Sequence, residues 1–173
     1  FAAPAEGAKV LNRGNGAEPY SLDPHRAVMT AENNVIGDLL LGLYTEDNTA
    51  HPILGAAESV ETAPDGLSWT FKIRAHTWSD GTPVTADDFV FAFRRVLDPN
   101  TAAEYASVLY PIKNALKVNK GQLGTDKLGV RAVDAKTLVI ELEYPAPFLP
   151  ELLTHYTTFP IPRAVVQKYG SDW

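Results

Sequence analysis

Cysteine is absent from the 173-residue sequence, which excludes disulfide bonds, thiol nucleophiles and thiolate metal ligands together. Long apolar runs are absent as well, since none approaches the roughly 20 residues that span a bilayer. The longest candidates, 35–44 and 138–142, are interrupted by Asp38, Gly42 and Glu141. Acidic residues outnumber basic ones by 21 to 15, and the net charge of −6 argues against a nucleic-acid partner, which needs a basic face.

The motifs of common catalytic sites are also missing. No HExxH sequence is present, and no carboxylate stands at facial-triad spacing from a histidine. The histidines are far apart in the sequence: His25, His51, His76 and His155. A serine nucleophile would need a strained elbow such as G-x-S-x-G, and there is none. We therefore expect no metal, no cofactor and no hydrolase chemistry.

Two short motifs have simpler explanations than catalysis. Gly14–Gly16 follows a possible strand, as a phosphate-binding loop would, but Pro19 and Pro24 follow where the phosphate-binding helix should begin. Asp87 and Asp88 could be imagined as an acid/base pair. Neighbours on a helix point some 100° apart, and stabilisation of a helix N-terminus explains them better.

The most regular pattern lies in residues 57–97. Polar and apolar residues alternate without a break through 67–74, which predicts a half-buried strand. Its apolar face would consist of Leu67, Trp69, Phe71 and Ile73. Residues 59–62 can form a partner strand, and 63–66 supplies the turn chemistry between them.

A capped helix is predicted to follow this hairpin. Thr85 stands at the N-cap position, and apolar residues recur at helical spacing behind it. They are Phe89, Val90, Phe93, Val96 and Leu97. Asp98-Pro99 is expected to end the helix.

The remaining pattern predicts short elements joined by proline-containing loops. We expect strands at 9–12, 130–133 and 137–142, the last two as a hairpin, and helices at 32–43, 102–109, 112–118, 148–155 and 162–169. In the helix at 32–43 the apolar face would contain Val35, Ile36, Leu39, Leu40 and Leu43. Helices and strands alternate irregularly, so the fold class is mixed α/β or α+β rather than a doubly wound sheet.

Aromatic side chains supply the only candidate recognition surface from pattern alone. Tyr105, Tyr110, His155 and Tyr156 lie near prolines, in segments that are poorly patterned as core. Exposed aromatic side chains near loops suit a binding surface, although most aromatic side chains in proteins belong to the core. These residues favour a binding module over an enzyme and leave its ligand open.

Residues 57–95 resemble the signature region of the family-5 extracellular solute-binding proteins of ABC importers. The resemblance rests on the alternating strand, the turn Asp-Gly-Thr-Pro-Val-Thr-Ala and the capped helix. Residues 21–25 resemble an early loop of the family. Further segments are similar to its oligopeptide-binding members in particular: 98–102, 105–107, 128–130, 152–155 and 160–162. The resemblance covers nearly the whole chain from about Lys9 onward.

The family implies a type II periplasmic-binding-protein fold, present here as an incomplete N-terminal part. By similarity, residues 1–44 begin a main lobe, 45–159 form a smaller lobe and 160–173 return to the main lobe. Members close two lobes around a ligand and do not catalyse a reaction. The family's groups for the peptide termini are expected beyond Trp173.

The resemblance also implies five ligand-binding residues. Val28, Met29 and Thr30 match a segment that runs along the bound peptide, Tyr105 matches a pocket tyrosine, and His155 matches a histidine near the side-chain pockets. Oligopeptide binders often carry an acidic residue where this chain has Val28. The resemblance therefore does not extend to selectivity for basic side chains at that pocket.

Export and partners follow from the same resemblance. A monomeric periplasmic receptor is expected, made with a signal peptide, which captures oligopeptides and delivers them to permease subunits in the inner membrane. Residues 1–5 could be the remnant of a cleavage site, although a frayed end is the favoured interpretation. A lipid-anchored receptor would need an N-terminal cysteine. The alternatives are another ligand (dipeptide, murein peptide, opine, nickel complex or oligosaccharide) and a structural fragment without ligand affinity.

Overall fold

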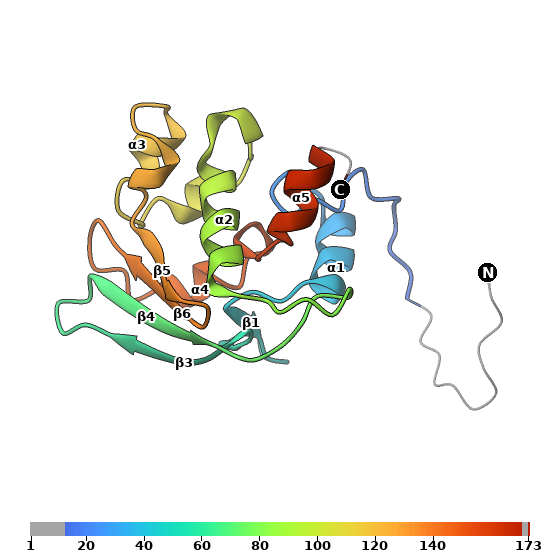
Figure 1. The fold of residues 1–173 in the computed structure, drawn as a ribbon. Helices are drawn as coiled ribbons and strands as arrows, with labels where there is room; N and C mark the ends of the chain where they lie inside the picture. The colour runs from blue at the N-terminus through green and yellow to red at the C-terminus, as the bar shows by residue number, and fades with distance from the viewer. Residues whose placement is uncertain (1–12, 171–172) are drawn as a thin grey trace.

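A four-stranded antiparallel sheet covered by one long helix forms the larger part of the molecule (Figure 1). The computed structural model describes residues 13–170 and residue 173, so the expected strand at 9–12 lies outside the described residues. The strands are β1 (Tyr44–Glu46), β2 (Pro52–Leu54), β3 (Ala57–Thr62), β4 (Ser68–Ile73), β5 (Val130–Asp134) and β6 (Thr137–Glu141). The helices are α1 (Thr30–Leu39), α2 (Ala86–Leu97), α3 (Ala115–Asn119), α4 (Leu149–Leu152) and α5 (Arg163–Tyr169). The described residues also contain four 3₁₀ turns: η1 (Pro99–Thr101), η2 (Ala106–Leu109), η3 (Thr125–Lys127) and η4 (Tyr156–Thr158).

The two predicted hairpins are confirmed, and they join into one sheet. The strand order is β3-β4-β6-β5, with every neighbouring pair antiparallel. On β4 the alternation has the predicted effect, since Trp69, Phe71 and Ile73 are buried. Phe71 lies opposite Leu138 of β6, and both side chains are fully buried. The predicted turn between β3 and β4 is closed by Gly66, whose φ of +71° lies in the left-handed region that glycine adopts readily.

Helix α2 packs on this sheet and supplies much of the core (Figure 1). Its predicted apolar face is confirmed, because all five residues of that face are buried. Asp88 at the third helical position accepts hydrogen bonds from the backbone N–H of Thr85 (2.9 Å) and from its hydroxyl (3.0 Å). Such a reciprocal cap satisfies donors that a helix start leaves unpaired. The interpretation of Asp88 as a helix-stabilising residue is therefore confirmed.

Two smaller apolar clusters lie outside the main core. One joins α1 to η4 and contains Ala27, Ile36, Tyr156 and Phe159. The other contains Ala92 of α2, Ile161 and Val166 of α5. The first cluster therefore packs segments from before and after the sheet against one another. The second packs α2 against the C-terminal helix.

The predicted helix at 32–43 is wrong at both ends. Helix α1 spans Thr30–Leu39, and Leu40 is already extended (φ −122°, ψ 158°). Leu39, expected in the core, is 64% exposed. The chain beyond α1 passes close to the Phe159 ring, since a Cβ at Gly42 would lie 2.5 Å from it.

Other local expectations needed smaller corrections. The helices expected at 102–109 and 112–118 are the 3₁₀ turn η2 and the short helix α3, since Ile112 pairs with Leu142 in a β-bridge. The helix expected at 148–155 is only the four-residue α4. Pro162 is the N-cap of α5 rather than its first residue. The hairpin of β1 and β2 was not predicted. Among the described residues, no helix has the length and apolar character to cross a membrane.

Candidate functional site

The segment from Ala27 to Thr30 is held in place by the carboxylate of Glu32. One carboxylate oxygen accepts from the N–H groups of Val28 (2.7 Å) and Met29 (2.9 Å). The other accepts from Tyr20 (3.1 Å) and Ser21 (3.0 Å). Burial raises the pKa of Glu32, but these four bonds outweigh it and keep the pKa below the ordinary value. Glu32 is therefore a buried anion at neutral pH.

Three aromatic rings gather beside this segment from distant parts of the chain. The Tyr105 ring lies 4.9 Å from the His155 ring and 6.0 Å from the Tyr156 ring, and His155 stacks on Tyr156 at 4.3 Å. The Tyr156 hydroxyl donates to the carbonyl of Ala27 (2.9 Å). The Tyr105 hydroxyl donates to the carbonyl of Val28 over 3.4 Å, which is a weak bond. We call Tyr105, His155 and Tyr156 the aromatic cluster.

The protonation states in the aromatic cluster follow from burial. Desolvation lowers the pKa of His155, so this imidazole is neutral at pH 7. Its Nδ1 accepts from the N–H of Thr157 (3.2 Å), which places the proton on Nε2. Burial raises the pKa of Tyr156 to about 12. The cluster thus offers two hydrogen-bond donors, the Tyr105 hydroxyl and the His155 Nε2–H.

A cavity of about 480 Å³ adjoins the aromatic cluster. His155 and Tyr156 line it together with Thr154, Glu46 and residues of α1. The lining mixes apolar, amide, hydroxyl and carboxylate groups, which suits a ligand with both polar and apolar parts. None of the described residues forms a group of three or more metal-binding side chains.

A second polar group secures the loop before the segment. Arg95 of α2 donates through Nη1 and Nη2 to the two carboxylate oxygens of Asp23, and its Nη1 lies 2.8 Å from His25 Nδ1. Burial raises the pKa of Asp23, but the guanidinium beside it prevails and holds the pKa below its usual value. Burial, with the Arg95 charge second, lowers the pKa of His25 to about 4.

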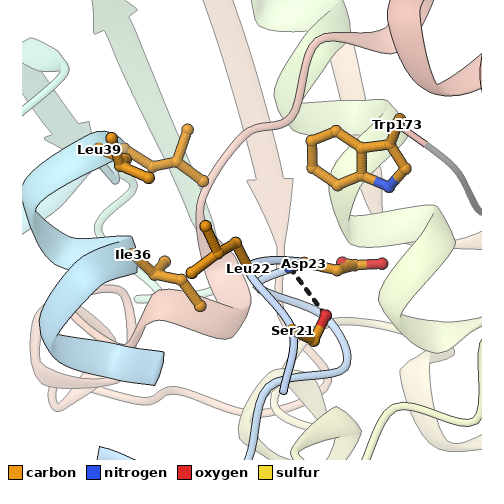
Figure 2. A pocket seen from close by; sticks show the side chains of 7 residues that line it. Ser21, Leu22, Asp23, Ile36, Leu39 and Trp173 are labelled. Carbon is orange, nitrogen blue, oxygen red and sulfur yellow. Dashed lines mark hydrogen bonds between the residues drawn. The ribbon is translucent and has the colours of Figure 1, made fainter. Parts of the chain in front are cut away.

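A smaller hollow of about 290 Å³ lies on the other side of this loop (Figure 2). Leu22, Ile36 and Leu39 point into it, with the Trp173 ring above Asp23. The hollow is mainly apolar, and Leu22 and Leu39 are exposed. It contains no member of the aromatic cluster, so we do not include it in the candidate site.

The structure brings three of the five expected site residues together. Val28, Tyr105 and His155 lie within one group of contacts, while Met29 is the N-cap of α1 and Thr30 its first residue. Tyr110 lies elsewhere, since its hydroxyl donates to Asn119 (2.8 Å) and its ring packs on the main core. The core interpretation of Tyr156 holds, because this residue is buried.

Sequence reasoning missed Glu32 and the Asp23–His25–Arg95 group. The signal for Glu32 was its place as the third helical residue, where a glutamate reaches back to the N-cap. Met29 at the N-cap concealed it, since the usual pattern has serine or threonine there. No local pattern links Asp23 to Arg95, which stand 72 residues apart.

Known proteins resemble this chain in fold and in sequence. The structure of Haemophilus influenzae OppA in complex with the peptide RPPGFSPFR superposes with a TM-score of 0.89 at 46% identity, covering 92% of this chain and 32% of that one. The fold is therefore part of a periplasmic-binding-protein fold. Residues 51–173 match the bacterial extracellular solute-binding proteins, family 5 (middle region), and the chain belongs to this family.

Two named relatives make the likeness more specific. The periplasmic oligopeptide-binding protein OppA of Escherichia coli (strain K12) is 43% identical over 168 residues, which are 95% of this chain and 31% of the relative. The OppA protein of H. influenzae is 45% identical over 162 residues, 92% of this chain and 30% of the relative. The chain thus spans about a third of the length of the curated relatives that it matches.

Proposed function

We propose that the protein is the peptide-capturing receptor of an ABC importer, and that this chain contributes one wall of its binding cleft. The observation that carries the proposal is the meeting of Val28, Tyr105 and His155 beside a mixed polar and apolar cavity. The likeness of more than 40% to oligopeptide-binding proteins gives the class of ligand. The receptor would bind and release its ligand unchanged, with no catalytic step.

The arrangement suits recognition of a peptide main chain. The weak bond from Tyr105 leaves both its hydroxyl and the Val28 carbonyl open to exchange with a ligand. The N–H of Thr30, at the start of α1, has no acceptor within the helix. These groups and the His155 Nε2–H can bond the carbonyl and amide groups that all peptides share. Side chains of the ligand would then extend into the adjoining cavity, where water can fill unused space.

The same proposal covers lobes, location and partners. The main apolar cluster begins at Leu43 and ends at Leu153, which supports a smaller lobe at 45–159 between main-lobe segments at 1–44 and 160–173. We place the protein in the periplasm as an exported monomer that docks on permease subunits of the inner membrane. The periplasmic relatives support this location.

Calorimetry of the complete protein tests the proposal. A mixed tripeptide library should bind with micromolar or tighter affinity. If binding heat were seen only with dipeptides, murein peptides, opines, nickel complexes or oligosaccharides, the receptor role would stand and the proposed ligand class would change. No heat with any of these would contradict the proposal and favour a structural role.

A further inference from the structure

Glu32 makes more contacts than a helix cap requires. Its side chain is buried, and it accepts four backbone N–H bonds of 2.7 to 3.1 Å. Only the bond from Met29 belongs to the cap of α1. The bonds from Tyr20 and Ser21 come from a separate part of the loop, and the bond from Val28 comes from the segment that faces the aromatic cluster.

Asp88 provides an internal comparison. It is also a buried acid at the third position of a helix, and it is 7% exposed. Its hydrogen bonds, however, come only from Thr85, the N-cap of the same helix. Glu32 therefore does what Asp88 does for its own helix and, in addition, fastens two stretches of loop to one another.

The bonds to Glu32 have a specific consequence for residues 27–30, which we call the binding edge. Because Glu32 occupies the N–H groups of Val28 and Met29, these donors are not open to a ligand. By holding these two N–H groups it also restricts where the Val28 carbonyl lies, 3.4 Å from the Tyr105 hydroxyl. We propose that Glu32 is the positioning residue of the peptide-binding edge, which it holds in a binding-ready conformation without touching the ligand. This inference rests on the proposed function.

Preorganisation gives the expected effect on affinity. A loop that must be ordered on binding lowers the affinity, because part of the interaction energy is spent on ordering. Glu32→Gln keeps the shape of the side chain but replaces one acceptor oxygen with an NH₂ donor, so two of the four N–H groups lose their partner. We expect the loop to open more often while the rest of the fold remains intact.

Hydrogen exchange and peptide affinity test the inference in the complete protein. In Glu32→Gln, amide exchange across residues 20–29 should rise at least roughly tenfold, with β4 and β6 unchanged. In the matched control Asp88→Asn, exchange should rise only at the start of α2. Peptide affinity should fall roughly tenfold in Glu32→Gln and by less than about twofold in Asp88→Asn, with both variants fully folded.

The outcomes separate the inference from the proposed function. Unchanged exchange at 20–29, or an affinity loss equal to that of Asp88→Asn, would overturn the positioning role. A wild-type protein that binds no peptide would refute the proposed function, while the exchange measurement would still decide whether Glu32 fixes the loop. If Glu32→Gln does not fold, Glu32→Asp serves instead, because its shorter carboxylate keeps the charge but cannot reach both stretches.

Discussion

Arg95 and Asp23 form an ion pair through two parallel hydrogen bonds, although 72 residues separate them in the sequence. Their side chains are only 16% and 12% exposed. The pair fastens the loop at 21–25 to the C-terminal end of α2, the helix that packs on the sheet. The loop leads into residues 27–30, the proposed binding edge, so the most regular helix of the chain supports the candidate site indirectly.

Breaking this pair from one side should destabilise the protein strongly. Arg95→Met removes the charged partner of the buried Asp23 carboxylate and leaves it only the bond from the His25 N–H (3.0 Å). We expect the free energy of unfolding to fall by about 3 kcal/mol. The double variant Asp23→Leu/Arg95→Met should recover part of the loss, since no unpaired charge remains, although the His25 N–H loses its acceptor. Urea denaturation followed by circular dichroism measures both changes.

Arg13 supplies the control for that experiment. Its ion pair with Asp38 (3.1 Å) is exposed, at 52% and 68% of the two side chains. Exposed pairs contribute roughly 0 to 1 kcal/mol, so Arg13→Met should change the unfolding free energy by less than about 1 kcal/mol. Equal losses for Arg13→Met and Arg95→Met would show that the buried pair has no special role.

His25 should make the protein less stable in mild acid. Between its unfolded pKa of 6.5 and its folded pKa of about 4, the unfolded state binds a proton that the folded state does not. The free energy of unfolding therefore falls as the pH falls through this window, by on the order of 3 kcal/mol. His25→Gln should flatten this part of the profile in denaturant titrations at pH 7, 6, 5 and 4.

Other titratable groups also contribute to the pH dependence of the unfolding free energy, so wild type and His25→Gln must be compared with each other. His155, with a pKa also lowered by burial, adds loss in the same direction and is present in both proteins. The lowered pKa values of Asp23 and Glu32 mean that their contributions disappear only as the pH falls below the ordinary carboxylate range. Identical slopes for wild type and His25→Gln between pH 6.5 and 4 would contradict the assignment to His25.

Local chemistry determined the elements that the sequence predicted well. Strand β4 follows from its alternation, because Trp69, Phe71 and Ile73 must share one face. Helix α2 follows from Thr85 and the apolar spacing behind it. The turn at Gly66 follows from the need for a positive φ. In each case the deciding residues are neighbours in the sequence.

Contacts between distant residues determined what the sequence did not predict. The pairing of β4 with β6 joins two hairpins about 65 residues apart, and nothing in either hairpin specifies its partner. The path of the chain after α1 brings Gly42 close to Phe159, a contact between distant residues that no local pattern indicates. The candidate site also depends on contacts between distant residues. The family resemblance indicated Val28, Tyr105 and His155, but only the fold shows the Tyr105–Val28 contact.

Tyr105 should matter more for binding than for stability. Its side chain is half-buried, its hydrogen bond to the Val28 carbonyl is weak, and its ring packs on the small apolar cluster of α1 and η4 rather than on the main core. Tyr105→Ala should therefore lower the melting temperature less than a change in the main core. Loss of the hydroxyl and of the ring beside His155 should weaken peptide binding roughly tenfold, which calorimetry measures. The matched control is Tyr110→Ala, which removes a ring that packs on the main core and its bond to Asn119.

The two tyrosine variants should behave in opposite ways. Tyr110→Ala should lower the melting temperature and leave the peptide affinity of the folded protein unchanged, because Tyr110 lies outside the aromatic cluster. If Tyr105→Ala instead lost as much stability as Tyr110→Ala, with affinity preserved, Tyr105 would be a core residue and not a ligand contact.

Gly42 and Gly37 allow a final test of how α1 meets the aromatic cluster. A Cβ at Gly42 would lie 2.5 and 2.6 Å from two atoms of the Phe159 ring, whereas a Cβ at Gly37 in α1 meets nothing within 4 Å. Gly42→Ala must displace that ring, and overpacking of this kind lowers the unfolding free energy by about 1 to 3 kcal/mol. Gly37→Ala should raise it by up to about 1 kcal/mol, since alanine is the better helix former. Phe159 also lines the cavity beside His155, so Gly42→Ala should weaken peptide binding as well. A Gly42→Ala protein as stable as Gly37→Ala would show that the Phe159 ring moves freely out of the way.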